Sequence, residues 1–309
     1  MLKMWKTGML AAMALCLLTA SQCGKDTPGP GEEPEPPVET GVALKAATFN
    51  IRFATTSDTG VKAWSARKDA CRSVVERYGF DVFGIQEALA VQQADLRELL
   101  PGYTFRFVGR DDGLNGEAVG IAWQSDRFES VEEGRFWLSP TPDEPSGSAE
   151  WGGVARHRVA VWNRLKEKDS GREFYFLATH LEVGEDVAAV RTRSAELIIG
   201  REAAFNPDGL PVFVVGDMNP VAPTEPAMRT FRTVYVDAWQ QAEADGVREG
   251  PIGSYNGFNP DANLESQSKR GDYIFYRGAV SLVKYKAVDD KFAGQYPSDH
   301  IPVMVVVNL

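Results

Sequence analysis

The stretch Phe213-Val214-Val215-Gly216-Asp217-Met218-Asn219-Pro220 decides how the rest of this sequence is interpreted. Its apolar start predicts a buried strand. A carboxylate and a carboxamide, Asp217 and Asn219, follow two residues apart. Residues two apart in an extended segment point the same way, so both should face the space beyond the strand end, where open α/β sheets bind ligands. The alternative is a strand that ends in an ordinary polar turn.

Other strand-like runs also carry polar side chains at one end. These residues are Asn50, Glu87, His180, Asp272, Asp299 and His300. Carboxylate and carboxamide oxygens suit a hard cation such as Mg²⁺. Histidines beside carboxylates suit proton transfer or an oriented, charged imidazole. Together these residues predict a polar site, assembled from strand ends, that can hold a metal ion.

Six short motifs occur in a fixed order along the chain: N-I-R, Q-E, T-H, G-D-M-N, D-Y-I-F and S-D-H. In this order they resemble the endonuclease/exonuclease/phosphatase superfamily, which includes pancreatic-type DNases, abasic-site endonucleases, sphingomyelinases and inositol-polyphosphate phosphatases. The resemblance covers about Leu44 to the C-terminus. It implies an α/β fold of the DNase I type, a four-layer sandwich. In it, two mostly antiparallel sheets pack face to face and helices flank them.

The resemblance also implies the chemistry, which is metal-assisted hydrolysis of a phosphate ester. Mg²⁺ or Mn²⁺ would be held by Glu87 and Asn50, with Asp299 nearby. A buried carboxylate at the end of an apolar strand is costly without a partner, and a metal ion supplies one to Glu87.

The catalytic roles implied by the resemblance fall on five residues. Asp217 would orient or deprotonate the attacking water, and Asn219 would hydrogen-bond the transition state. His300, oriented by Asp272, would bind the phosphoryl oxygens. His180 would donate to the phosphate or assist the leaving group.

Three further residues are candidates for substrate binding. Arg110 lies in a G-R-D-D-G loop that resembles one branch of the family, and the alternative is a hairpin turn with an Arg–Asp pair. Arg158 precedes a strand where that branch shows an arginine, which could grip a phosphate with two hydrogen bonds. Asn256 stands where the branch has a histidine in a T-F-H-G-F loop. After His180 the branch reads L-D-H, whereas this chain reads Leu181-Glu182-Val183, which puts the substrate preference in doubt.

The first 43 residues predict export and a tether. Lys3 and Lys6 precede an apolar run that is short for a bilayer span and typical of a signal peptide, residues 1–22. Small residues before Cys23 resemble a bacterial lipoprotein cleavage site. We therefore expect a membrane-anchored lipoprotein in the periplasm or on the cell surface, and ordinary secretion is the alternative. Residues 23–43, rich in proline, glycine and glutamate, predict a disordered tether.

Residues 44–309 are expected to form one domain. Only Cys71 of the three cysteines falls in it, so we expect a buried thiol and no internal disulfide. Strands are expected at 44–52, 82–87, 103–108, 118–123, 127–137, 173–180, 272–276, 280–287 and 301–307, and helices from 64, at 91–100, from 186 to 205 and at 226–233.

The charge and the motifs restrict the function. A formal net charge of -10 gives no basic footprint for duplex nucleic acid, although a nuclease in the strict sense remains an alternative. A non-catalytic surface binding module on the same fold is the other alternative. No H-E-x-x-H motif supports a zinc protease. The expected partner is a phosphate ester of unknown identity, and no obligate protein partner is evident.

Overall fold

Two β-sheets form the centre of the fold, and the computed structural model describes residues 41–309. These residues form one compact unit, Gly41–Leu309. The predicted signal peptide, the lipid attachment at Cys23 and most of the predicted tether lie outside the described residues. Within the described range, no helix has both the length and the apolar character needed to cross a membrane.

The first sheet has seven strands and the second has six. In spatial order, the first consists of β10 (Arg248–Glu249), β12 (Ser281–Ala287), β13 (Val303–Asn308), β1 (Ala43–Asn50), β2 (Val82–Ala88), β4 (Ala118–Gln124) and β3 (Tyr103–Gly109). The second consists of β5 (Phe128–Trp137), β6 (Val159–Glu167), β7 (Glu173–His180), β8 (Val212–Asp217), β11 (Asp272–Arg277) and β9 (Val236–Asp237).

Both sheets are mostly antiparallel, with one parallel pair at the centre of each and a short parallel pair, β10 with β12, at the edge of the first. β1 runs parallel to β2 in the first sheet, and β7 runs parallel to β8 in the second. The register places His180 beside Asp217 across the parallel pair, and Asp217 beside Asp272 across the antiparallel pair of β8 and β11. Three polar residues from different parts of the chain therefore meet at one edge of the second sheet.

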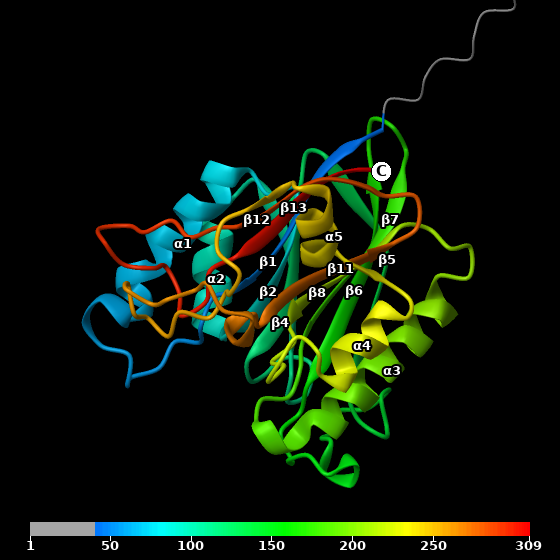
Figure 1. The fold of residues 1–309 in the computed structure, drawn as a ribbon, viewed down its shortest axis with the longest axis horizontal. Coiled ribbons are helices and arrows are strands. Elements are labelled where there is room, and N and C mark those ends of the chain that lie inside the picture. Colours follow the sequence, from blue (N-terminus) through cyan, green and yellow to red (C-terminus); the bar gives the residue numbers. More distant parts are fainter. Residues whose placement is uncertain (1–40) are drawn as a thin grey trace, which may run out of the picture. The chain divides into compact units, whose positions relative to one another are not determined.

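Helices cover the outer face of each sheet (Figure 1). α1 (Trp64–Tyr78) and α2 (Ala90–Leu99) pack on the first sheet, whereas α3 (Ala188–Phe205) and α4 (Pro226–Arg232) pack on the second. α5 (Ala238–Asp245) contacts β11 and β12. The short 3₁₀ turns are Gly60–Lys62, Ala149–Trp151, Glu185–Val187 and Gln267–Lys269.

The strand pattern explains why the sheets pack face to face. On β8, Phe213 and Val215 enter the core between the sheets, and Val212 and Val214 enter the core beneath α3 and α4. Side chains alternate between the two faces of a strand, so an uninterrupted apolar run covers both faces. The predicted four-layer α/β sandwich is confirmed.

Two helices differ from the expectation. The helix expected from residue 186 begins at Ala188, because Asp186 lies inside a 3₁₀ turn and the residue before the helix is Val187. α5 was not among the expected helices, and it begins after Asp237. The Asp237 carboxylate accepts the Trp239 backbone N–H at 3.1 Å, as an aspartate at a helix N-cap does. Cys71 is buried and free, and no other cysteine lies in residues 41–309.

Candidate active site

A cleft of about 590 Å³ opens where the strand ends of the two sheets meet. Eight of the predicted site residues line it: Glu87, Arg110, Arg158, His180, Asp217, Asn219, Asp299 and His300. They come from strand ends and loops spread over more than two hundred residues of sequence. The fold therefore brings most of the predicted site together.

Asn50 and Asp272 lie directly behind the cleft and orient residues that line it. The Asn50 Nδ2 donates to Glu87 Oε1 at 3.1 Å and to Asp217 Oδ2 at 3.0 Å. The Asn50 Oδ1 accepts the Arg52 backbone N–H at 3.0 Å. Asn50 therefore braces the two carboxylates in this arrangement and does not turn its oxygen to the cleft. Asp272 is fully buried, and its Oδ2 lies 2.7 Å from His300 Nδ1.

Asn256 does not line the cleft. It is 3% exposed, its Nδ2 donates to the Ser298 carbonyl at 3.0 Å, and its Oδ1 accepts the Phe258 N–H at 2.8 Å. Both ends of the amide therefore hold the loop together. The neighbouring Tyr255 lines the cleft instead.

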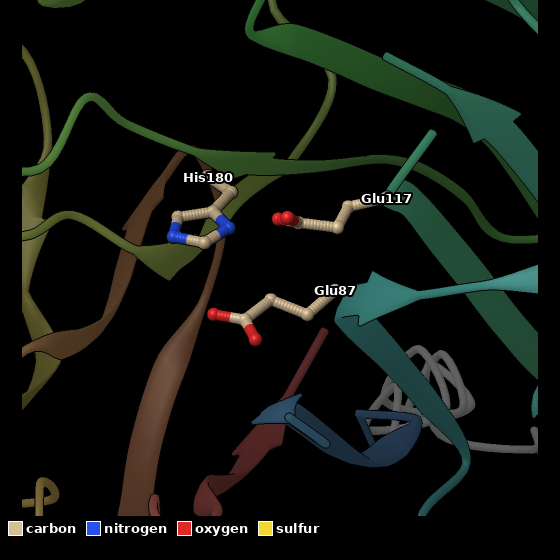
Figure 2. Close-up of side chains that lie close together, drawn as sticks. All are labelled: Glu87, Glu117 and His180. Atoms are coloured by element: carbon tan, nitrogen blue, oxygen red, sulfur yellow. The ribbon is translucent and has the colours of Figure 1, made fainter. Parts of the chain in front are cut away.

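Glu117 is a cleft residue that the sequence analysis missed. Figure 2 shows its carboxylate directed toward Glu87 and His180, and one ligand atom from each of the three lies within 4.8 Å of the others. Arg110 Nη1 donates to Glu117 Oε2 at 2.6 Å. Burial raises the pKa of Glu117, and the nearby Arg110 opposes this effect. The G-R-D-D-G loop pointed to Arg110, but nothing in its residue pattern identified the acid seven residues later.

Two histidines approach the same oxygen of Asp217. His180 Nε2 lies 3.5 Å and His300 Nε2 lies 3.7 Å from Asp217 Oδ2. Burial and the positive charge of Arg158 hold the pKa of His180 well below its usual value. Burial also acts against the charged form of His300, but the charges of Asp272 and Asp217 outweigh it and raise that pKa well above its usual value. The cleft therefore pairs a neutral imidazole with a charged one.

Asp217 lies between these groups and is 2% exposed. Burial raises its pKa to about 6, with His300 acting in the opposite direction and Asp272 adding to the rise. A carboxylate with a pKa near neutrality can accept a proton from water and release it again.

Three arginines line one wall of the cleft, from the β3–β4 loop and the segment before β6. They are Arg110, Arg156 and Arg158. Glu182, 1% exposed, accepts from Arg156 Nη1 at 2.9 Å and from Arg158 Nη2 at 3.4 Å. The Nε of Arg158 is buried and has no hydrogen-bond partner among the described residues. Buried, unpaired N–H groups at a cleft wall suit an anionic ligand.

Backbone strain is concentrated at the cleft. Arg52, Glu87 and Asn219 adopt positive φ angles of 56°, 68° and 46°, and all three line the cleft. The left-handed region is unfavourable for residues with a Cβ and is often found at functional sites. Gly271 also lines the cleft, and a Cβ at this position would lie 3.3 Å from Asp217 Oδ1 and 3.6 Å from His300 Cε1. Glycine keeps this space open.

A family model described as the Endonuclease/Exonuclease/phosphatase family matches residues 47–300. The chain belongs to this family. A comparison with curated proteins gives no match.

Solved structures of family members are similar over nearly their full length. A mannosyl-6-phosphatase from Bacteroides thetaiotaomicron is 33% identical with a TM-score of 0.77, and the match covers 86% of this chain and 100% of that one. A second family protein from the same organism is 32% identical with a TM-score of 0.78, covering 86% and 98%. The human Nocturnin catalytic domain, at 21% identity and a TM-score of 0.66, covers 86% and 94% and shares the fold.

Enzymes of this family generally use divalent metals, and the residues present fit a hard cation. Glu87 accepts one hydrogen bond on each oxygen, from Asn50 and from the Phe53 N–H at 3.0 Å, which leaves lone pairs on both. Glu87 and Asp299 both line the cleft, and the charge of Glu87 adds to the burial that raises the pKa of Asp299, while His300 opposes it.

Proposed function

We propose that this protein is a divalent-metal-dependent hydrolase that removes a terminal phosphate from a sugar. The observation that carries the proposal is the set of groups that line one cleft. Glu87 and Asp299 suit a cation, Arg156 and Arg158 suit an anion, and Asp217 lies with two histidines. The 33% identity to the Bacteroides mannosyl-6-phosphatase over its whole length supports a sugar phosphate as the substrate.

The closed arginine wall supports a phosphate monoester. Arg110, Arg158 and His180 also line a second, small cavity of about 10 Å³. Ala118 and Val119 are among its other lining residues. Such a space holds about one water molecule. This small cavity has no room for the second ester arm of a diester beside the arginines, so the arginines suit the free oxygens of a terminal phosphate.

Glu87, with Asp299, would hold Mg²⁺ or Mn²⁺, braced by Asn50. Such an ion neutralises a phosphate oxygen and the charge that develops on the leaving group. The protein's own side chains would carry out the remaining steps. Asp217 takes a proton from the attacking water, whose position is kept free by Gly271. Asn219 lines the cleft, with its Nδ2 donating to the Leu181 carbonyl at 3.1 Å, and would hydrogen-bond the transition state.

The two histidines act differently because their charges differ. His300, charged and oriented by Asp272, donates Nε2–H to a phosphoryl oxygen and stabilises the transition state. Neutral His180 donates one hydrogen bond to the phosphate. Because it is neutral, it adds no further positive charge beside the arginines. Arg158 and Arg110 grip the phosphate during binding.

A substrate panel tests the proposal. Wild-type protein should release phosphate from mannose 6-phosphate in the presence of Mg²⁺, and EDTA should abolish the release. Glu87→Gln should remove turnover and weaken Mg²⁺ binding in calorimetry without unfolding the chain. Turnover that persists in EDTA, or Mg²⁺ affinity equal to wild type in Glu87→Gln, would contradict the metal assignment. Cleavage of DNA alone would favour a nuclease, and ligand binding without any turnover would favour a binding module.

We also propose that the enzyme acts outside the cytoplasm, held to a membrane by a lipid on Cys23. The sequence pattern before Cys23 supports this proposal. Cell fractionation of wild type and Cys23→Ser tests it. The wild type should sediment with membranes and the variant should not. Equal solubility of both would contradict the lipid anchor and favour ordinary secretion.

A further inference from the structure

We propose that Tyr255 determines substrate specificity by stacking on the sugar ring of the leaving group. This inference rests on the proposed function and assigns the part of the cleft that receives the sugar. It also replaces the sequence-based expectation for this loop, in which Asn256 was the substrate contact.

The exposure pattern of the loop singles out Tyr255. Its neighbours Ser254 and Asn256 are 1% and 3% exposed, whereas Tyr255 is 47% exposed and lines the cleft. A half-exposed aromatic side chain that lines a cleft is typical of ligand sites, where aromatic groups supply the apolar contact area. The backbone alternates in direction along this loop, so one residue faces the cleft and its neighbours hold the loop.

The Tyr255 ring is held in place beside the catalytic centre. Its backbone N–H donates to the Lys269 carbonyl at 3.0 Å, and the residue forms a β-bridge with His300. The ring centroid lies 5.1 Å from that of His300, in an edge-on orientation of 64°. The amide of Asn256 fixes the following turn. A sugar resting on this ring would therefore place its ester oxygen near the group that contacts the phosphate.

The surroundings of Tyr255 match the two surfaces of a pyranose. Such a ring has an apolar C–H face and a rim of hydroxyl groups. Tyr255 offers an aromatic ring, and Ser268 and Lys269, which also line the cleft, offer a hydroxyl and an ammonium group. The arginine wall comes from other segments and takes the phosphate.

A nucleic acid or a lipid as the leaving group fits the surroundings of Tyr255 less well than a sugar. Sites for single-stranded nucleic acid stack successive bases on several aromatic side chains. The other phenyl or phenol ring lining the cleft within residues 41–309 is Phe53, and the Arg52 guanidinium lies 4.3 Å from its centroid. A lipid chain would require an apolar wall, but the polar residues Ser268 and Lys269 also line the cleft, and the Lys269 carbonyl accepts the Tyr255 N–H.

The test compares two substrates and three variants. Mannose 6-phosphate carries a ring and glycerol 3-phosphate does not. Tyr255→Ala should lower kcat/KM for mannose 6-phosphate about tenfold, mainly through KM, because an aromatic contact contributes on this order. It should change glycerol 3-phosphate turnover less than about threefold. Tyr255→Phe should keep the preference, since the ring is retained. Val131→Ala, a change at an apolar residue that is similarly exposed but does not line the cleft, should leave both substrates unaffected.

The outcomes separate this inference from the proposed function. Equal losses on both substrates would mean that Tyr255 acts through His300, and no loss on either would remove its role. If the wild type hydrolyses no phosphate ester, the proposed function fails. Calorimetric binding of mannose 6-phosphate in Mg²⁺ then tests the stacking alone, and equal affinities of wild type and Tyr255→Ala would overturn it. Circular dichroism checks that each variant is folded.

Discussion

The surroundings of His180 and His300 differ more than their positions suggest. Both rings are buried, and both point Nε2 toward the same Asp217 oxygen, at 3.5 and 3.7 Å. Arginines surround His180, whereas a carboxylate 2.7 Å away holds the other nitrogen of His300. Burial disfavours the charged form in both cases, so the sign of the neighbouring charges decides the protonation state. A single cleft thus holds one neutral and one charged imidazole.

The largest expected effect comes from removing the charge that distinguishes His300. Asp272→Asn should lower the pKa of His300 and reduce kcat about 10²–10⁴-fold, as loss of a positioned acid or base group does. Steady-state kinetics measures kcat, and NMR titration of the His300 ring protons measures the pKa. Asp290→Asn, which breaks the 2.6 Å ion pair with Arg77 elsewhere on the protein, serves as the control. A loss below threefold would mean that Asp272 does not activate His300.

The pH dependence of kcat/KM should show the titration of both Asp217 and His300. Asp217 has a raised pKa of about 6, so it is protonated below that pH and kcat/KM should fall about tenfold per pH unit as the pH drops through it. His300 also has a raised pKa, so it stays charged until the pH passes well above its usual value. Activity should therefore decline again on the alkaline side. In Asp272→Asn the alkaline decline should move to lower pH, and an unchanged profile would contradict the comparison.

The surroundings of His180 can be altered through Arg158. Arg158→Met should raise KM about tenfold with a smaller change in kcat, because a charge-assisted contact to the phosphate is lost. The pKa of His180 should rise, since one nearby positive charge is gone. Arg158→Lys keeps the charge and should recover part of the affinity. A variant that loses kcat while KM stays constant would place Arg158 in the chemical step.

The smallest effect should come from filling the space beside His300. In Gly271→Ala the new Cβ would lie 3.3 Å from Asp217 Oδ1, so the attacking water would be displaced slightly. We expect kcat to fall about three- to tenfold with unfolding temperature unchanged, because small misplacements at a reacting centre are costly. Gly102→Ala, where no atom lies within 4 Å of the new Cβ, is the matched control. An unchanged kcat would show that this space is not used.

Sequence periodicity predicted the strands and the polar residues at their ends. The run before Asp217 is apolar on both faces, so it had to lie inside the sandwich, and β8 ends at Asp217. The sequence predicted less well which loop side chains contact the cleft. Glu117 and Tyr255 face the cleft and Asn256 does not, and which side chain of a turn points outward depends on the whole loop geometry. The roles of the individual site residues stay predictions.

The sequence by itself determined that an apolar framework carries acids, amides and two histidines at its strand ends. The tertiary structure decided what each of them can do. Asp272 is 28 residues away from His300 in the chain but touches its ring, and the charge of Arg158 acts on His180 from the segment before β6. A pKa depends on burial and on charges within a few ångströms. Those neighbours come from distant segments, so only the packed fold sets the charge of each histidine.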